Sequence, residues 1–254
     1  MKIRSLFISD IHLGTISCKH KQVLHLLKDI ESNLPENIYL VGDILDFWKL
    51  GKGFNWKKEH NTIIQKLLRL SRKGVNIHYI IGNHDEWFRS MPNDFRLGDI
   101  KVSDTYDYTT VVGKKFLIIH GDQYDTFLIQ NNILTKLGSF AYDMLVGLNT
   151  ALSYVRRTFG LPYWSLSHYL KLKAKTATKV IDIFESTMCE ALKLKGYDGV
   201  ICGHIHMCKI KTLPDAFTYI NCGDWTESCT AIIETADGKF DILNYGDKTL
   251  QNTY

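Results

Sequence analysis

Residues 8–14 of the chain, ISDIHLG, place Asp10 and His12 directly after a short apolar run. The same arrangement recurs in the stretches IYLVGDILD, IHYIIGNHD, FLIIHGD, GVICGHIH and YINCGDW. Short apolar runs that end in Gly and a polar residue are typical of buried strands. Because the carboxyl ends of the strands of an α/β sheet form the edge where ligands bind, the sequence predicts that these polar residues converge there.

The segments between the expected strands indicate an α/β fold with one helical insertion. Residues 19–33 and 59–73 carry apolar side chains at helical spacing, and Gly74 is a typical helix stop. The recurring short apolar runs typical of strands are absent over residues 125–196 and then resume. We therefore expect a single domain over residues 1–254, with residues 125–196 forming a helical cap inserted into it.

Composition favours a soluble globular protein, since 45% of the 254 residues are hydrophobic and 23% are charged. The first apolar run is too short for the core of a signal peptide, and no later stretch is an uninterrupted membrane span. These features predict a cytoplasmic location. The six cysteines contain no C-x-x-C pair, so we expect reduced thiols without a chemical role.

The residues at the expected strand ends make up a set of metal-ligand types. Carboxylate, carboxamide and imidazole groups bind Mn, Fe, Zn or Co, and seven such ligands suit two ions that share a bridging carboxylate. A lone histidine such as His25, His60 or His78 is more often a surface or core residue, and a lone Asp after Gly is often a turn residue. Recurrence at five strand ends favours the metal site, with the candidate ligands Asp10, His12, Asp43, Asn83, His120, His204 and His206.

The blocks DIH, GDILD, GNHD, HGD and GHIH occur in this order, and with them the chain resembles the calcineurin-like metallophosphoesterases. The resemblance implies a β-sandwich flanked by helices, an αββα arrangement. It also implies one divalent ion bound by Asp10, His12, Asp43 and His206, and a second bound by Asp43, Asn83, His120 and His204. In such two-metal enzymes the ions activate a water molecule and neutralise phosphate oxygens, so no nucleophilic side chain is expected.

Two further positions match residues that act on the phosphate in that family. By resemblance His84 touches the reacting phosphate without binding metal, and Asp46 orients it. An imidazole paired with a carboxylate can stabilise phosphate charge and donate a proton to the leaving oxygen. We interpret Asp85, Asp122 and Asp224 as supporting or capping residues and leave them out of the catalytic set.

The insertion after HGDQYD and the ending YINCGDWTESCTAIIE are similar to the UDP-2,3-diacylglucosamine pyrophosphohydrolases. This resemblance implies cleavage of a pyrophosphate bond in lipid A synthesis, with manganese, at the membrane surface. Characterised members tend to carry Arg after GN, where this chain has His84. The alternatives are a general phosphodiesterase or nucleotide phosphatase, a nucleic-acid-binding protein and a metal-bound scaffold without activity. No recognised nucleic-acid module is present, and we expect no such partner.

Residues 125–196 carry nine Lys and Arg against five Asp and Glu, a net charge of +4 that equals that of the whole chain. Aromatic residues alternate with these basic ones. Such a surface suits a lipid-linked diphosphate or an anionic membrane, and we interpret Arg157 and Lys171 as candidate substrate-binding residues. The alternative is a solvated helix whose aromatic side chains pack inward.

Overall fold

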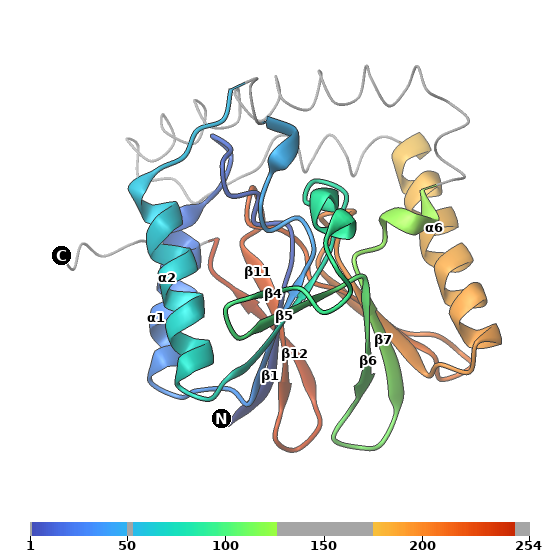
Figure 1. The fold of residues 1–254 in the computed structure, drawn as a ribbon. Helices are drawn as coiled ribbons and strands as arrows, with labels where there is room; N and C mark the ends of the chain where they lie inside the picture. Colours follow the sequence, from blue (N-terminus) through green and yellow to red (C-terminus); the bar gives the residue numbers. More distant parts are fainter. Residues whose placement is uncertain (1, 50–52, 126–174, 247–254) are drawn as a thin grey trace, which may run out of the picture.

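The computed structural model describes residues 2–49, 53–125 and 175–246. Two sheets face each other (Figure 1). The first has the strand order β12-β11-β1-β2-β3-β5-β4, and the second has the order β6-β7-β8-β10-β9. The strands are β1 (Ile3–Ile8), β2 (Asn37–Val41), β3 (Asn76–Ile80), β4 (Arg96–Leu97), β5 (Ile100–Ser103), β6 (Thr105–Thr109), β7 (Lys115–Ile119), β8 (Gly199–Cys202), β9 (Lys209–Thr212), β10 (Thr218–Asn221), β11 (Thr230–Thr235) and β12 (Phe240–Asn244).

Helices cover the outer face of each sheet. Helices α1 (His20–Glu31) and α2 (Lys58–Arg72) pack on the first sheet, and α6 (Lys175–Leu194) packs on the second (Figure 1). Short 3-10 helices follow three strands at the functional edge: η1 (Phe47–Lys49), η2 (Glu86–Ser90) and η3 (Asp122–Tyr124). The αββα sandwich predicted from the sequence is confirmed.

Successive side chains of the central strands point into different layers of the molecule. On β1, Leu6 and Ile8 join the core under α1 and α2, whereas Phe7 joins the core between the sheets. On β7, Phe116 lies between the sheets and Leu117 lies under α6. This is the two-residue period of a strand with both faces buried, and it explains why these strands are continuous apolar runs in the sequence.

The expected helices at residues 19–33 and 59–73 are confirmed, the first with shorter bounds and the second shifted by one residue. Helix α1 buries Val23, Leu26, Leu27 and Ile30. Helix α2 ends just before Gly74, whose φ of +93° is the left-handed conformation in which glycine ends helices without steric cost.

The predicted insertion over residues 125–196 lies largely outside the described residues. Its final part is α6, whose side chains Phe184, Met188 and Leu192 are buried against the second sheet. Their spacing of four residues places them on one helix face. This segment therefore belongs to the outer layer of the sandwich, and the cap over the rest of the range stays a prediction.

His78 provides a test of the packing between the two sheets. Its imidazole stacks on the ring of Tyr39 with 5.2 Å between centroids and lies 4.3 Å from that of Tyr106. Burial first, and then the charges of Lys101 and Arg96, lower the pKa of His78 from 6.5 to about 4. The unfolded chain therefore binds a proton more readily than the folded chain between these two values, so folding is favoured above pH 6.5 and is penalised as the pH falls toward 4.

We predict that His78→Phe, which keeps a flat apolar ring but cannot bind a proton, loses less stability than the wild type between pH 6.5 and pH 4. Urea unfolding of both proteins at pH 7, 5.5 and 4.5 measures their free energies of unfolding. The other titrating groups contribute equally to the pH dependence of both proteins, so their contributions cancel in the comparison. Parallel stability profiles for the two proteins would show that His78 does not contribute.

Candidate metal centre

The polar residues at the strand ends adopt a backbone conformation that non-glycine residues usually avoid. The φ angle is +55° at Asp10, +52° at His12, +55° at Asp43, +70° at His204 and +53° at His206. Each such residue costs roughly 1 kcal/mol or more in strain, which persists only where the surroundings impose it. Backbone hydrogen bonds join the same loops, from Asp10 to Gly42 at 3.0 Å and from His12 to Asp43 at 2.9 Å.

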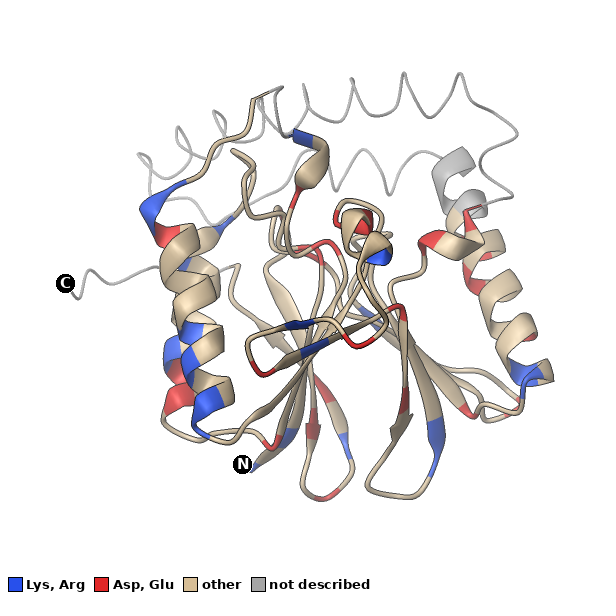
Figure 2. Ribbon diagram, in the orientation of Figure 1, with Lys and Arg blue, Asp and Glu red and all other residues tan. Residues whose placement is uncertain are grey.

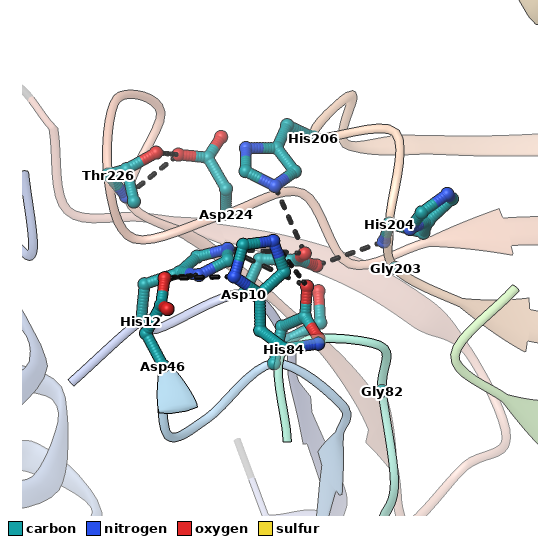
Figure 3. A network of polar contacts seen from close by, with 12 residues as sticks. Asp10, His12, Asp46, Gly82, His84, Gly203, His204, His206, Asp224 and Thr226 are labelled. Carbon is teal, nitrogen blue, oxygen red and sulfur yellow. Dashed lines mark hydrogen bonds and ion pairs between the residues drawn. The ribbon is translucent and has the colours of Figure 1, made fainter. Parts of the chain in front are cut away.

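Two buried aspartates divide their oxygens between the loops and the interior of the cluster. Asp10 Oδ2 accepts the backbone N–H of His204 at 3.0 Å, and Asp43 Oδ1 accepts that of His84 at 2.8 Å. The other oxygens face imidazoles. Asp10 Oδ1 lies 3.1 Å from His206 Nε2, and Asp43 Oδ2 lies 3.3 Å from His120 Nε2. One oxygen thus positions each carboxylate, and the other faces the cluster, as Figure 3 shows for Asp10.

The tautomers of two histidines follow from their hydrogen bonds, because a carboxylate or carbonyl oxygen can only accept. His12 Nδ1 donates to Asp46 Oδ2 at 3.1 Å, and His120 Nδ1 donates to the carbonyl oxygen of Val41 at 2.9 Å. In its neutral form each ring therefore keeps a lone pair on Nε2, the atom that faces the aspartates. This is the arrangement by which a second layer of groups orients histidine ligands toward a metal.

The donor set fits divalent cations by a test that is independent of sequence motifs. Asp10 Oδ1, His12 Nε2, Asn83 Oδ1 and His120 Nε2 are buried and make no well-aligned hydrogen bond among the described residues, although Asp10 Oδ1 and His120 Nε2 each lie close to an oppositely charged group. In the tautomers above, all four are lone-pair atoms. Buried acceptors without donors are unfavourable, and convergence of several such atoms is what a bound cation satisfies.

The charges within the cluster stabilise one another. Burial alone would raise the pKa of Asp10, but His206 outweighs burial and the pKa falls to about 2. Burial alone would lower the pKa of His12, but its hydrogen bond to Asp46 and the nearby charges of Asp43 and Asp10 raise the pKa to about 9. Without a metal ion the site therefore favours protonated imidazoles beside ionised carboxylates, and a bound cation would take the place of the protons on Nε2.

His84 lies at the rim of this cluster. Its Nδ1 donates to Asp46 Oδ2 at 2.9 Å, and its Nε2 lies 3.9 Å from Asp43 Oδ2. Asp46 therefore accepts hydrogen bonds from both His12 and His84 on one oxygen. The pair with His84 was predicted by resemblance, whereas no spacing in the sequence indicates the link to His12.

The remaining predicted residues lie in different places. His206 faces Asp10, whereas the His204 ring is turned away from it (Figure 3), and its Nε2 donates to Asp125 Oδ2 at 2.7 Å. The His204 ring still lies 5.1 Å from that of His120. The candidate substrate-binding residues Arg157 and Lys171 lie outside the described residues. The roles of all these residues stay predictions.

Three aspartates that we left out of the catalytic set support the loops. Asp85 accepts the N–H groups of Ile44 and Gly82 at 2.9 and 2.6 Å, which ties the loops after β2 and β3 together. Asp224 accepts backbone N–H groups of the turn that follows it, including that of Thr226 (Figure 3). Asp122 pairs with Arg89. Acidic residues lie along the loops at this edge of the two sheets (Figure 2).

A second group of possible ligands, Cys18, His20 and His60, lies near the start of α1 and α2. His60 Nδ1 accepts the backbone N–H groups of Gly14 and Lys57 at 3.3 and 3.4 Å. The ring proton of neutral His60 is therefore on Nε2, the wrong tautomer for binding metal through that atom. We assign no metal to this group.

A two-sheet sandwich with carboxylates and imidazoles gathered at its strand ends defines the class of metal-dependent hydrolases. The family profile described as calcineurin-like phosphoesterase matches residues 3–208. The chain belongs to this family, and it is a metal-dependent hydrolase of phosphoester or pyrophosphate bonds that uses divalent metal ions.

Curated relatives cover nearly the whole chain. It is 24% identical over 241 residues to the UDP-2,3-diacylglucosamine hydrolase of Histophilus somni, covering 92% of this chain and 97% of the relative. It is 27% identical to the UDP-2,3-diacylglucosamine hydrolase of Neisseria meningitidis, covering 89% and 92%. A hypothetical protein from Pyrococcus horikoshii has a similar solved structure, with a TM-score of 0.49 at 10% identity and coverage of 96% and 88%. None of the helices in the described part of the chain combines the length and apolar character needed to cross a membrane.

Gly82 allows a test of the centre that does not alter any candidate ligand. A Cβ atom at this position would lie 2.3 Å from Asp43 Oδ1 and 2.9 Å from His120 Cδ2. We predict that Gly82→Ala displaces both side chains and weakens Mn²⁺ binding about tenfold or more, measured by calorimetry on metal-depleted protein.

Gly74→Ala is the matched control. Nothing lies within 4 Å of its Cβ position, but its φ is +93°. This variant should lose about 1 kcal/mol of stability and keep its metal affinity. Equal metal affinity in Gly82→Ala and the wild type would contradict the proposed packing of the centre.

Proposed function

We propose that the protein hydrolyses the pyrophosphate bond of UDP-2,3-diacylglucosamine or of a similar nucleotide-linked lipid, with two Mn²⁺ ions. The buried, unpartnered acceptor atoms at the strand ends carry the hydrolase part of the proposal. The substrate part is supported by relatives named UDP-2,3-diacylglucosamine hydrolase that align over nearly the full length of the chain.

Asp10, His12, Asp43 and His206 would bind one ion, and Asp43, Asn83, His120 and His204 the other. When bound, such ions neutralise phosphate oxygens and activate water for attack on phosphorus. His204 would use Nδ1, because its Nε2 proton is donated to Asp125. Fe, Zn and Co also prefer these ligand types.

His84 would act on the substrate directly. Because Asp46 holds the Nδ1 proton, Nε2 is the atom left to face the reacting phosphate. In protonated His84 this nitrogen stabilises phosphate charge and donates its proton to the leaving oxygen as the phosphorus–oxygen bond breaks. General acid catalysis of this kind contributes about 10²- to 10⁴-fold in rate.

An apolar cavity beside the centre supports a substrate with an apolar part. Its volume is about 360 Å³, and apart from Asp46 its lining is apolar: Leu13, Leu45, Phe47, Phe54, Trp56 and Ile64. A metal centre that served small diesters alone would not need such a cavity. We propose in addition that Arg157 and Lys171 contact the diphosphate or an anionic membrane surface.

His84 itself favours a second candidate function. Characterised members of the lipid-linked family tend to carry Arg at this position, and a proton-donating imidazole suits a wider range of leaving groups. A general phosphodiesterase or nucleotide phosphatase is therefore the alternative.

A substrate comparison separates the two functions. Manganese-loaded protein is assayed against UDP-2,3-diacylglucosamine, UDP-N-acetylglucosamine, cyclic nucleotides and bis(p-nitrophenyl) phosphate, with phosphorus NMR of the products. We expect kcat/KM to be at least 100-fold higher for the diacylated substrate, with UMP as a product. Equal turnover of the diester and the lipid would overturn the lipid-linked function and support the alternative.

Variants of His84 and Asp46 should have different effects on metal binding. His84→Ala should lose about 10²- to 10⁴-fold in kcat with unchanged Mn²⁺ content. Asp46→Asn should lose rate and also bind Mn²⁺ more weakly, because a neutral amide oxygen is a weaker acceptor than a carboxylate oxygen and holds the N–H groups of His12 and His84 less firmly. Metal analysis and kinetics of both variants measure this, and a normal metal affinity in Asp46→Asn would show that the His12 link is dispensable.

A further inference from the structure

Trp48 lies on the ring of His84. The two ring centroids are 4.1 Å apart and the ring planes differ by 29°, so the indole is stacked on the imidazole. Trp48 is half exposed, with 55% of its surface accessible, so the stacked pair lies at the surface of the molecule. No pattern in the sequence assigned Trp48 a role.

The position of the indole is itself fixed by the loops after β2 and β3. Trp48 Nε1 donates to Glu86 Oε1 at 3.3 Å. The backbone N–H of Phe47 donates to the carbonyl oxygen of His84 at 3.0 Å, and that of Lys49 donates to Asp46 Oδ1 at 3.1 Å. The helix η1 therefore carries the indole on the same short segment that follows Asp46, and the segment is bonded to the loop that carries His84.

The hydrogen bond to Asp46 is not sufficient to orient the imidazole. It fixes Nδ1, but the torsion that turns a histidine ring is broad and has no sharp staggered minima. His12 contacts His84 with its ring plane at 88° and a centroid distance of 4.6 Å, so one further contact comes from the metal centre. The indole supplies a flat surface parallel to the imidazole, which limits rotation of the ring out of the plane that directs Nε2 toward Asp43.

We propose that Trp48 is a positioning residue for His84, which it holds in the orientation that allows Nε2 to donate a proton to the leaving oxygen. This inference rests on the proposed function of His84. It assigns Trp48 no contact with metal, and it predicts that the indole matters only where the reaction needs the imidazole.

The experiment is a double-mutant cycle with two leaving groups. The full-length, manganese-loaded protein is assayed on the p-nitrophenyl and phenyl esters of UMP. The p-nitrophenolate ion leaves without a proton at neutral pH, whereas phenolate is a stronger base and benefits from proton donation. We expect Trp48→Ala to lose about 10- to 100-fold in kcat on the phenyl ester but less than threefold on the p-nitrophenyl ester. Its Mn²⁺ affinity should be unchanged.

The cycle places Trp48→Ala in the His84→Ala background. If the indole acts through the imidazole, its loss should have no further effect there, because the two residues act as a unit. Trp48→Phe, which restores a flat ring, should recover most of the rate. Glu86→Ala should lose rate in the same substrate-dependent way, and Glu86→Gln, which keeps the acceptor, should not.

Trp87→Ala is the matched control. Trp87 lies on η2, is 56% exposed and contacts Phe47 and Phe88. Its loss should change kcat less than twofold on either ester. Thermal melting of all variants separates these effects from loss of folding.

The outcomes distinguish the two proposals. Full activity in His84→Ala would overturn the role of His84, and the role of Trp48 with it. A loss in His84→Ala together with an undiminished effect of Trp48→Ala in that background would overturn only the role of Trp48. Equal losses on the two esters would do the same, since a residue that merely binds substrate or supports the loop is indifferent to the leaving group.

Discussion

The arrangement of the loops at the strand ends depends on burying two aspartates, Asp10 and Asp43, where the two sheets meet. Ionised carboxylates are costly to bury unless they are paired and hydrogen-bonded. Each aspartate meets this condition with one oxygen on a backbone N–H of another loop and the other on an imidazole. The loops must therefore approach closely, and the left-handed backbone at five of the candidate ligands follows from this approach.

The groups around the candidate ligands also specify which atom of each ligand faces the centre. His12 and His120 donate their Nδ1 protons to Asp46 and to the Val41 carbonyl oxygen, and both retain Nε2 for the interior. An imidazole without these hydrogen bonds would not keep Nε2 directed at the centre, and it would bind a cation more weakly. Gly82 and Gly203 also allow this geometry, since a side chain at Gly82 would overlap with Asp43 and one at Gly203 would overlap with Asp10.

The sequence predicted the strands that carry the candidate ligands, because an apolar run followed by Gly and a polar residue is a local pattern. It also predicted α1 and α2 from their apolar stripes. It did not predict β4, β9 and β12, which are short or partly exposed and lack a long apolar run, nor β5, β6 and β11, which do not end in that pattern. Helix α6 was included in the insertion because the short apolar runs typical of strands are absent there, although Phe184, Met188 and Leu192 have the spacing of a core-facing helix.

Contacts between loops are the part of the site that sequence patterns cannot supply. Asp46 and His12 are 34 positions apart, and Trp48 and His84 belong to loops after different strands. Their proximity follows from the parallel pairing of β1, β2 and β3, which brings three strand ends to one edge in register. Asp46 consequently touches both a candidate metal ligand and the candidate proton donor. The same carboxylate therefore anchors Nδ1 of His84 to the centre, and the stacked indole of Trp48 restricts the ring about that anchor.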